Sequence, residues 1–200
     1  MCQCHASPFQ HAPVSQVTVS LPDWINTFVD WETPLSNDQD KMKLAIALAA
    51  ENVARQTGGP FASIIVHQKT GAILSVGVNQ VVPQTNSNLH GEVMAIMMGE
   101  QRLKQFSLSL ADEYELFTSC EPCAMCMGAI LWSGVKRLVC SATGDDARAI
   151  GFDEGPVFEA SYEYLEQAGI TVERNVLQTE GNTVLQNYVS NGGLLYNGAD

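Results

Sequence analysis

Apolar residues recur at helical spacing in several stretches of the chain, and the clearest of these is residues 38–56. Asp38 and the polar residues before it offer helix caps, and Gly58-Gly59-Pro60 ends the pattern. Residues 22–31 carry a shorter apolar face that includes Trp24 and Phe28, which we expect to pack on the main domain or on a second subunit. The pattern therefore predicts helices at 22–31, 38–56, 90–103, 122–132, 161–168 and 179–189.

Short apolar runs lie between these helices and predict strands at 61–67, 72–79, 114–119, 135–142 and 170–174. Lys69-Thr70-Gly71 predicts a hairpin turn between the first two strands. Residues 143–158 are rich in Gly and Asp, and we expect them to form a functional loop. Helices that alternate with strands in this order indicate an α/β fold, a three-layer α-β-α sandwich with a mixed central sheet of about five strands.

The 200 residues suit one domain with added terminal segments. We expect residues 1–36 to form an N-terminal leader with a short helix, 37–190 the main domain, and 191–200 a Gly-rich tail. No apolar run reaches the ~20 residues that a membrane span needs. The N-terminus lacks the basic and apolar blocks of a signal peptide. The sequence therefore predicts a cytoplasmic protein that does not enter membranes.

Acidic residues outnumber basic ones by 22 to 10, which gives a net charge of −12. The excess is greatest near the C-terminus, where residues 138–200 contain ten acidic and two basic side chains. A protein that grips nucleic-acid phosphates needs a basic surface. We therefore expect a small-molecule substrate and no nucleic-acid partner.

Two thiols, Cys123 and Cys126, stand three residues apart after Pro122, so they share one face at the start of the helix predicted there. Backbone N–H groups and the helix dipole favour thiolates at that end. His90, upstream, supplies a nitrogen. Three such ligands leave one tetrahedral position of a zinc ion open for water, which is the pattern of a catalytic site.

The same thiols also admit a redox pair, buried apolar thiols, or a structural zinc with Cys120 as fourth ligand. Cys2, Cys4 and His5 form a weaker second candidate metal site. A clustered Cys-x-x-Cys in a chain without secretion signals favours metal or redox chemistry over a disulfide framework.

Glu92 lies two residues after His90, so the chain reads His-x-Glu and then Pro-Cys-x-x-Cys. This order is the signature of the zinc deaminases. A zinc ion lowers the pKa of its bound water to about 7. Glu92 is then the candidate that accepts the water proton and passes it to a ring nitrogen and to the leaving amine. A C–NH₂ group beside a ring nitrogen is the substrate that such a site accepts.

His-Gly-Glu, Cys-Glu-Pro-Cys-Ala-Met-Cys and the Met-Gly-Ala-Ile-Leu-Trp that follows resemble the cytidine-deaminase-like zinc deaminase superfamily. Within it, the chain is most similar to the branch of guanine deaminases and tRNA adenosine deaminases. The similarity spans about residues 38–158. The resemblance implies one Zn²⁺ per subunit with a bound water, a homodimer, and conversion of guanine to xanthine and ammonia.

The substrate contacts are also implied by this resemblance, with Phe61 in a Gly-Pro-Phe turn beside the site and Asn79 as a purine-binding amide. Residues 150–154 resemble the segment that carries a second active-site acid, which we assign to Glu154 rather than Asp153. A carboxylate suits the N1–H and 2-amino donors of guanine. Tyr196 of the tail is a weaker candidate that would close the pocket.

Trp132 follows Cys126 by two turns, and its side chain fits either a pocket wall or the core. The substrate also stays open. Another small aminated heterocycle, such as an aminotriazine, adenine or a pyrimidine nucleoside, needs the same mechanism. A tRNA adenosine deaminase is disfavoured by the acidic charge. A zinc domain without activity remains a further alternative.

Overall fold

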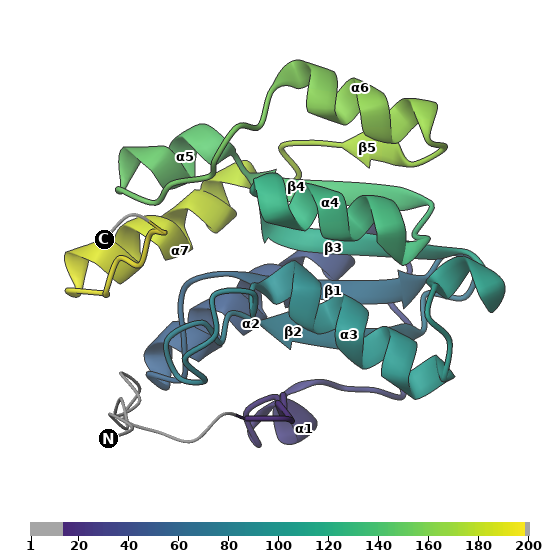
Figure 1. The fold of residues 1–200 in the computed structure, drawn as a ribbon, viewed down its shortest axis with the longest axis horizontal. Helices are drawn as coiled ribbons and strands as arrows, with labels where there is room; N and C mark the ends of the chain where they lie inside the picture. Colours follow the sequence, from purple (N-terminus) through teal and green to yellow (C-terminus); the bar gives the residue numbers. More distant parts are fainter. Residues whose placement is uncertain (1–13, 199–200) are drawn as a thin grey trace, which may run out of the picture.

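A five-stranded mixed sheet forms the centre of the computed structural model, which describes residues 14–198 (Figure 1). Its strands are β1 (Ala62–His67), β2 (Ile73–Val78), β3 (Tyr114–Cys120), β4 (Arg137–Ala142) and β5 (Thr171–Glu173), in the order β2-β1-β3-β4-β5. β1 is antiparallel to both β2 and β3, whereas β3, β4 and β5 are parallel. The sheet confirms the prediction of about five strands in a mixed arrangement.

Helices cover both faces of this sheet (Figure 1). α2 (Asp38–Ala54) and α7 (Gln178–Ser190) pack on one face, while α3 (Gly91–Leu103) and α4 (Ala124–Ser133) lie on the other. α6 (Glu159–Gln167) packs beside β5. The short elements are α1 (Ile25–Phe28), α5 (Gly144–Ala149) and a 3₁₀ turn at Leu108–Leu110.

Alternation along the strands builds two separate apolar layers, because successive side chains of a strand point to opposite faces. Ile64 and Phe117 pack in the layer under α2, whereas Ile65 and Leu116 pack in the layer under α3 and α4. All four side chains are fully buried. This two-sided core gives the three-layer α-β-α sandwich that the sequence predicted.

A buried ionic network ties α2 to the middle of the sheet. Lys41 Nζ lies 2.5 Å from Glu115 Oε1, and Arg137 donates to the other oxygen of that carboxylate at 3.0 Å. Arg137 also donates to Asp38 Oδ1 at 2.9 Å, in the first turn of α2. Buried charges of this kind are stable only when paired, so the network fixes the register of α2 on β3 and β4.

Three element predictions need correction. The helix expected at 22–31 is only α1, because the Asp30 carboxylate accepts hydrogen bonds from the Glu32 and Thr33 N–H groups and turns the chain. The helix expected at 122–132 begins at Ala124, so Cys123 caps α4 instead of lying in its first turn. Residues 143–158 are not all loop.

α5 lies inside that stretch and is stabilised by a capping box at its first turn. The Gly- and Asp-rich composition of the stretch gave no sign of this helix. The Thr143 hydroxyl accepts a hydrogen bond from the Asp146 N–H, and the Asp146 carboxylate accepts one from the Thr143 N–H. Two otherwise unpaired donors of the first turn are thereby satisfied.

Some expectations concern parts that the structure does not test. Cys2, Cys4 and His5, the weaker metal candidate, lie outside the described residues. The division into leader, domain and tail stays a prediction. Among the described residues, no helix is both long and apolar enough to cross a membrane.

Candidate active site

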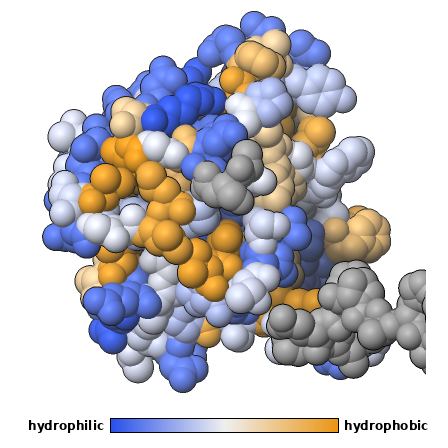
Figure 2. Space-filling model, turned by 60° about the vertical axis from the view of Figure 1, so that its left-hand side comes forward, coloured by the Kyte–Doolittle hydropathy of each residue, from blue (hydrophilic) through white to orange (hydrophobic). Residues whose placement is uncertain are grey.

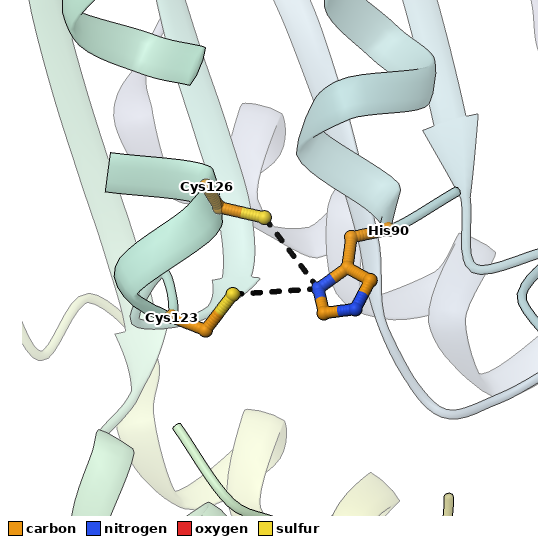
Figure 3. Close-up of side chains that lie close together, drawn as sticks. All are labelled: His90, Cys123 and Cys126. Carbon is orange, nitrogen blue, oxygen red and sulfur yellow. Dashed lines mark hydrogen bonds between the residues drawn. The ribbon is translucent and has the colours of Figure 1, made fainter. Parts of the chain in front are cut away.

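The thiols and the imidazole approach one another because two helices begin at the same end of the sheet. Cys123 is the N-cap of α4, which follows β3, and Cys126 lies in the first turn of that helix. His90 is the N-cap of α3, which follows the long loop after β2. Figure 3 shows the three side chains converging from these two helix starts. Both helix N-termini favour anionic ligands there.

The spacing of the three side chains fits a tetrahedral zinc ion. His90 Nδ1 lies 3.5 Å from Cys123 Sγ and 3.5 Å from Cys126 Sγ, and all three ligand atoms lie within 4.8 Å of one another. Zn–S and Zn–N bonds of about 2.3 and 2.0 Å at a tetrahedral angle place sulfur and nitrogen about 3.5 Å apart. The donor set therefore matches zinc without rearrangement.

The fourth candidate ligand, Cys120, does not join this group. Its side chain is buried in β3, and its Sγ donates toward the Thr143 carbonyl oxygen at 3.5 Å. Burial raises the pKa of the Cys120 thiol well above its usual value, which opposes formation of a thiolate. Among residues 14–198, the metal-ligating group thus has three members and one open position. That number is typical of a catalytic site.

Of the two thiols, Cys126 is the one that keeps its proton. The hydrogen bond from Cys126 and the contact with His90 lower the pKa of Cys123 to about 4, against the opposing effect of burial. The same hydrogen bond, together with burial, raises the pKa of Cys126 well above its usual value. Metal binding requires both thiolates, so it releases that proton.

Glu92 lies beside the ligands with its side chain almost fully buried. Cys126 donates its S–H to Glu92 Oε2 at 3.4 Å. Burial, together with the negative charge of Cys123, raises the pKa of Glu92 to about 6. A carboxyl group with a pKa this close to neutrality can both accept and return a proton.

A small cavity of about 40 Å³ lies next to these groups. Its volume accommodates water, but it is smaller than a heterocyclic base. The lining combines ligands, carboxylates and aromatic rings: Phe61, Asn79, His90, Glu92, Glu121, Cys123, Phe152, Asp153, Glu154 and Tyr196. The structure therefore brings nearly all of the site residues that the sequence suggested to one cavity.

The two neighbouring acids, Asp153 and Glu154, have different environments. Glu154 is 7% exposed, and burial followed by the charges of Cys123 and Glu92 raises its pKa to about 8. Its carbonyl oxygen accepts a hydrogen bond from the Ala124 N–H at 3.0 Å, which holds the loop against the start of α4. Asp153 is exposed, and its carboxylate accepts from the Gly155 N–H at 2.8 Å. Glu154 is thus the buried acid, while Asp153 shapes the rim.

Three aromatic rings wall the cavity. The Phe152 ring makes edge-on contacts with Phe61 at 5.0 Å and Tyr196 at 5.1 Å between ring centroids. The Tyr196 hydroxyl is buried and has no hydrogen-bond partner among the described residues. Such a box suits a flat aromatic ring with a polar edge.

Asn79 lies at the end of β2 and is 2% exposed. Its Oδ1 accepts a weak hydrogen bond from the Val81 N–H at 3.3 Å. No hydrogen bond occupies its Nδ2 among the described residues, so this donor is available to a ligand in the cavity.

Sequence reasoning missed Phe152 and Glu121 as lining residues. Phe152 lies inside the segment that the resemblance singled out, so the signal was present but was attributed to the acids alone. Glu121 is held by Arg174 Nε at 2.5 Å and accepts from the Gly144 N–H at 2.8 Å. It fixes the turn before α4, a role that only the fold reveals.

Trp132 does not reach the cavity, so its interpretation as a pocket wall is wrong, and so is the alternative that it belongs to the core. Its side chain is 80% exposed. α4 begins at Ala124 and runs away from the metal ligands, and six residues past Cys126 a helix has turned to a different face.

Residues 35–142 match the model of the cytidine and deoxycytidylate deaminase zinc-binding region. The guanine deaminase of Bacillus subtilis is 39% identical over 123 residues, which cover 62% of this chain and 76% of that protein. A solved guanine deaminase from Nitrosomonas europaea superposes with a TM-score of 0.84 at 35% identity, covering 90% of this chain and all of the other. A tRNA-specific adenosine deaminase of Buchnera aphidicola is 27% identical over 158 residues, or 78% of this chain and 98% of that protein.

Proposed function

Because the chain belongs to the cytidine-deaminase-like zinc deaminases, in the guanine deaminase branch, and is a hydrolase of carbon–nitrogen bonds, we propose that it deaminates guanine. Guanine plus water then gives xanthine and ammonia. The proposal rests on one observation above all: a single cavity joins the metal-ligating group to Asn79, to Glu154 and to three aromatic rings.

The cofactor of this proposal is one zinc ion per subunit, held by His90, Cys123 and Cys126. When bound, it supplies a water of lowered pKa as the nucleophile for the ring carbon that bears the amine. Glu92 takes the proton from that water and delivers it to the adjacent ring nitrogen. The proton of the hydroxyl added to the ring carbon then passes through Glu92 or Glu154 to the amine, which leaves as ammonia while the C–O bond becomes the new carbonyl of xanthine.

Recognition of guanine requires hydrogen-bonding groups that match its edge. The Asn79 Nδ2 donates to a ring acceptor. The Glu154 carboxyl group accepts from the N1–H and amine edge through its unprotonated oxygen. Phe61 and Phe152 contact the faces and edge of the purine, while the Tyr196 hydroxyl, which has no partner among residues 14–198, finds an acceptor on the ligand. Asp153 is the rim acid in this arrangement.

The cavity of about 40 Å³ is narrow for a purine, so we expect side chains of the tail to shift when the substrate enters. A larger cavity of about 330 Å³ lies across the Gly58-Gly59 turn, between the end of α2 and Leu194. Apolar side chains gather on the side of the molecule that carries α7 and the C-terminal end (Figure 2). A small shift of the Tyr196 ring, which packs against Gly59 between the two cavities, would enlarge the smaller cavity and keep the hydroxyl beside the ligand.

The proposed assembly is a homodimer through the outer face of α4 and α6. An apolar groove of about 350 Å³ lies there, lined by Met127, Gly128, Leu131, Tyr164 and Leu165 among others. Trp132 of α4 is 80% exposed and Phe158, the N-cap of α6, is 66% exposed, and monomers rarely expose apolar surface of this extent. A second copy would cover these groups.

A substrate panel tests the proposal. Zinc-loaded protein is assayed for ammonia release from guanine, adenine, cytosine, their nucleosides, aminotriazines and a tRNA anticodon stem, ranked by kcat/KM. We expect guanine to lead by at least about tenfold. A leading nucleoside, aminotriazine or tRNA would replace guanine while leaving the deaminase chemistry intact, whereas no release from any substrate would reject the function.

A further inference from the structure

The segment before the matched deaminase region contacts the loops that form the purine pocket. Residues 14–34 precede that region, which begins at residue 35. Ile25 and Val29 of this segment are buried against the α2 side of the sheet. Packing alone would anchor the segment, but two chains of hydrogen bonds also lead from it to Asn79.

The first chain begins at the Trp24 indole. Trp24 Nε1 donates to Thr57 Oγ1 at 3.0 Å, and that hydroxyl donates to Asn52 Oδ1 at 2.8 Å. Asn52 Nδ2 in turn donates to the carbonyl oxygens of Gly59 at 2.9 Å and Asn79 at 3.0 Å. Asn52 is completely buried, and all of these contacts use its one carboxamide.

The second chain begins at the Ser20 backbone. Gln84 Nε2 donates to the Ser20 carbonyl at 2.7 Å, and Gln84 Oε1 accepts from the Ser20 N–H at 3.3 Å. Gln84 Nε2 also lies 3.2 Å from Gln80 Oε1. Gln80 Nε2 then donates to the carbonyls of Thr57 at 2.7 Å and Asn79 at 3.1 Å.

Both chains end on the carbonyl oxygen of Asn79, which accepts from two buried amides. The Gly58-Gly59 turn packs against the same carbonyl, since a Cβ at Gly58 would lie 1.9 Å from it. The Asn79 N–H donates to the Phe61 carbonyl at 2.9 Å. The backbone of the two residues that flank the cavity is thus fixed from outside, by groups that do not line it.

We propose that Ser20 and Trp24 position Asn79 in the purine pocket, through Gln84–Gln80 and Thr57–Asn52 respectively. This inference rests on the proposed function for the identity of the ligand. Small displacements of a binding group weaken the complex steeply, because hydrogen bonds depend on both length and angle. The N-terminal segment is therefore a determinant of substrate affinity and not only a packing element.

Trp24→Phe tests the first chain, because it removes the indole N–H while keeping a ring against Phe28 and Arg55. Trp31→Phe is the matched control. Trp31 belongs to the same segment and lies against the core and Arg102, away from Thr57. We expect Trp24→Phe to raise KM for guanine by about threefold to tenfold, as for one lost hydrogen bond. Values of kcat and zinc content should stay within about twofold of wild type, and Trp31→Phe should change neither constant.

A double-variant cycle then asks whether the effect passes through Asn79. Trp24→Phe combined with Asn79→Ala should have nearly the KM of Asn79→Ala alone, since the group to be positioned is gone. A fully additive rise in KM would overturn the proposal. So would a Trp24→Phe protein that loses kcat and zinc with KM unchanged, because that pattern indicates a general structural defect.

Hydrogen exchange gives a readout that does not depend on the substrate. Trp24→Phe, and not Trp31→Phe, should increase amide exchange at Asn79 and Val81, whose N–H groups bond to Phe61 and to the Asn79 side chain. Unchanged exchange at these amides would contradict the proposal. Failure of wild-type protein to deaminate guanine would instead reject the proposed substrate, and this exchange result would still decide the positioning role.

Discussion

Of the three buried carboxyl groups that line the cavity, Glu121 is paired with Arg174, whereas Glu92 and Glu154 have raised pKa values of about 6 and about 8, with burial as the largest cause of each. Their surroundings differ in one respect. Glu92 adjoins the metal ligands and contacts Cys126, whereas Glu154 faces the cavity from the loop after α5. Different environments suit the two acids to different proton transfers.

Glu92→Gln should lower kcat for guanine by about 10²- to 10⁴-fold, because the amide keeps the shape of the side chain but cannot carry a proton. Zinc content, measured by metal analysis, should be unchanged, since the three ligands remain. A variant that retains its zinc and more than about half of the wild-type kcat would show that another group moves the proton.

The neighbouring acids provide a matched pair. Glu154→Gln should reduce kcat/KM by about 100-fold or more, because the side chain is buried and faces the cavity. Asp153→Asn should change it by less than about threefold, because that carboxylate lies at the rim and caps Gly155. Steady-state kinetics on both variants decides the assignment, and the reverse ranking would exchange the two roles.

Helix α2 carries a comparable pair of lysines. Lys41→Met leaves Glu115 buried with one partner fewer, and the free energy of unfolding should fall by about 3 kcal/mol. Lys43 is 63% exposed and pairs with Asp40 on the surface, so Lys43→Met should cost less than about 0.5 kcal/mol. Urea denaturation measures both, and equal losses would show that the buried network does not stabilise α2 on the sheet.

Elements with strong periodicity could be predicted from the sequence, and elements held by local polar contacts could not. The helix at 38–56 and the five strands are recognisable because their apolar positions record which face is buried. α5 was not predicted from the sequence because Gly and Asp are typical of loops. The helix depends on the contact between Thr143 and Asp146, which only the structure shows.

The site shows the same division. His90, Glu92 and the two thiols carry a spacing that the sequence displays. The surroundings of Asn79 depend on Asn52, Gln80 and Trp24. The hydrogen bonds of these residues join positions up to 33 residues apart, so no sequence motif marks them. Trp132 was misjudged because its direction depends on where α4 begins.

At the scale of the molecule, the apolar groove on α4 and α6 predicts a dimer that Gly128→Glu should break. A Cβ at Gly128 would have no atom within 4 Å in the subunit, so the change leaves the monomer fold intact but places a charge in the groove. Sedimentation equilibrium should report a dimer for wild type and a monomer for Gly128→Glu. Leu110→Glu, which alters a side chain 55% exposed on the 3₁₀ turn, is the control and should stay dimeric. A wild-type monomer would refute the assembly.

The activity proposed for this fold replaces the amine of guanine with an oxygen from water. The most direct measurement is to incubate zinc-loaded protein with guanine in heavy-oxygen water and to follow the product by mass spectrometry. We expect xanthine that carries a single heavy oxygen, formed together with an equal amount of ammonia, and no such product with Glu92→Gln. Guanine recovered unchanged, under conditions in which the same protein releases ammonia from another heterocycle, would rule out guanine as the substrate.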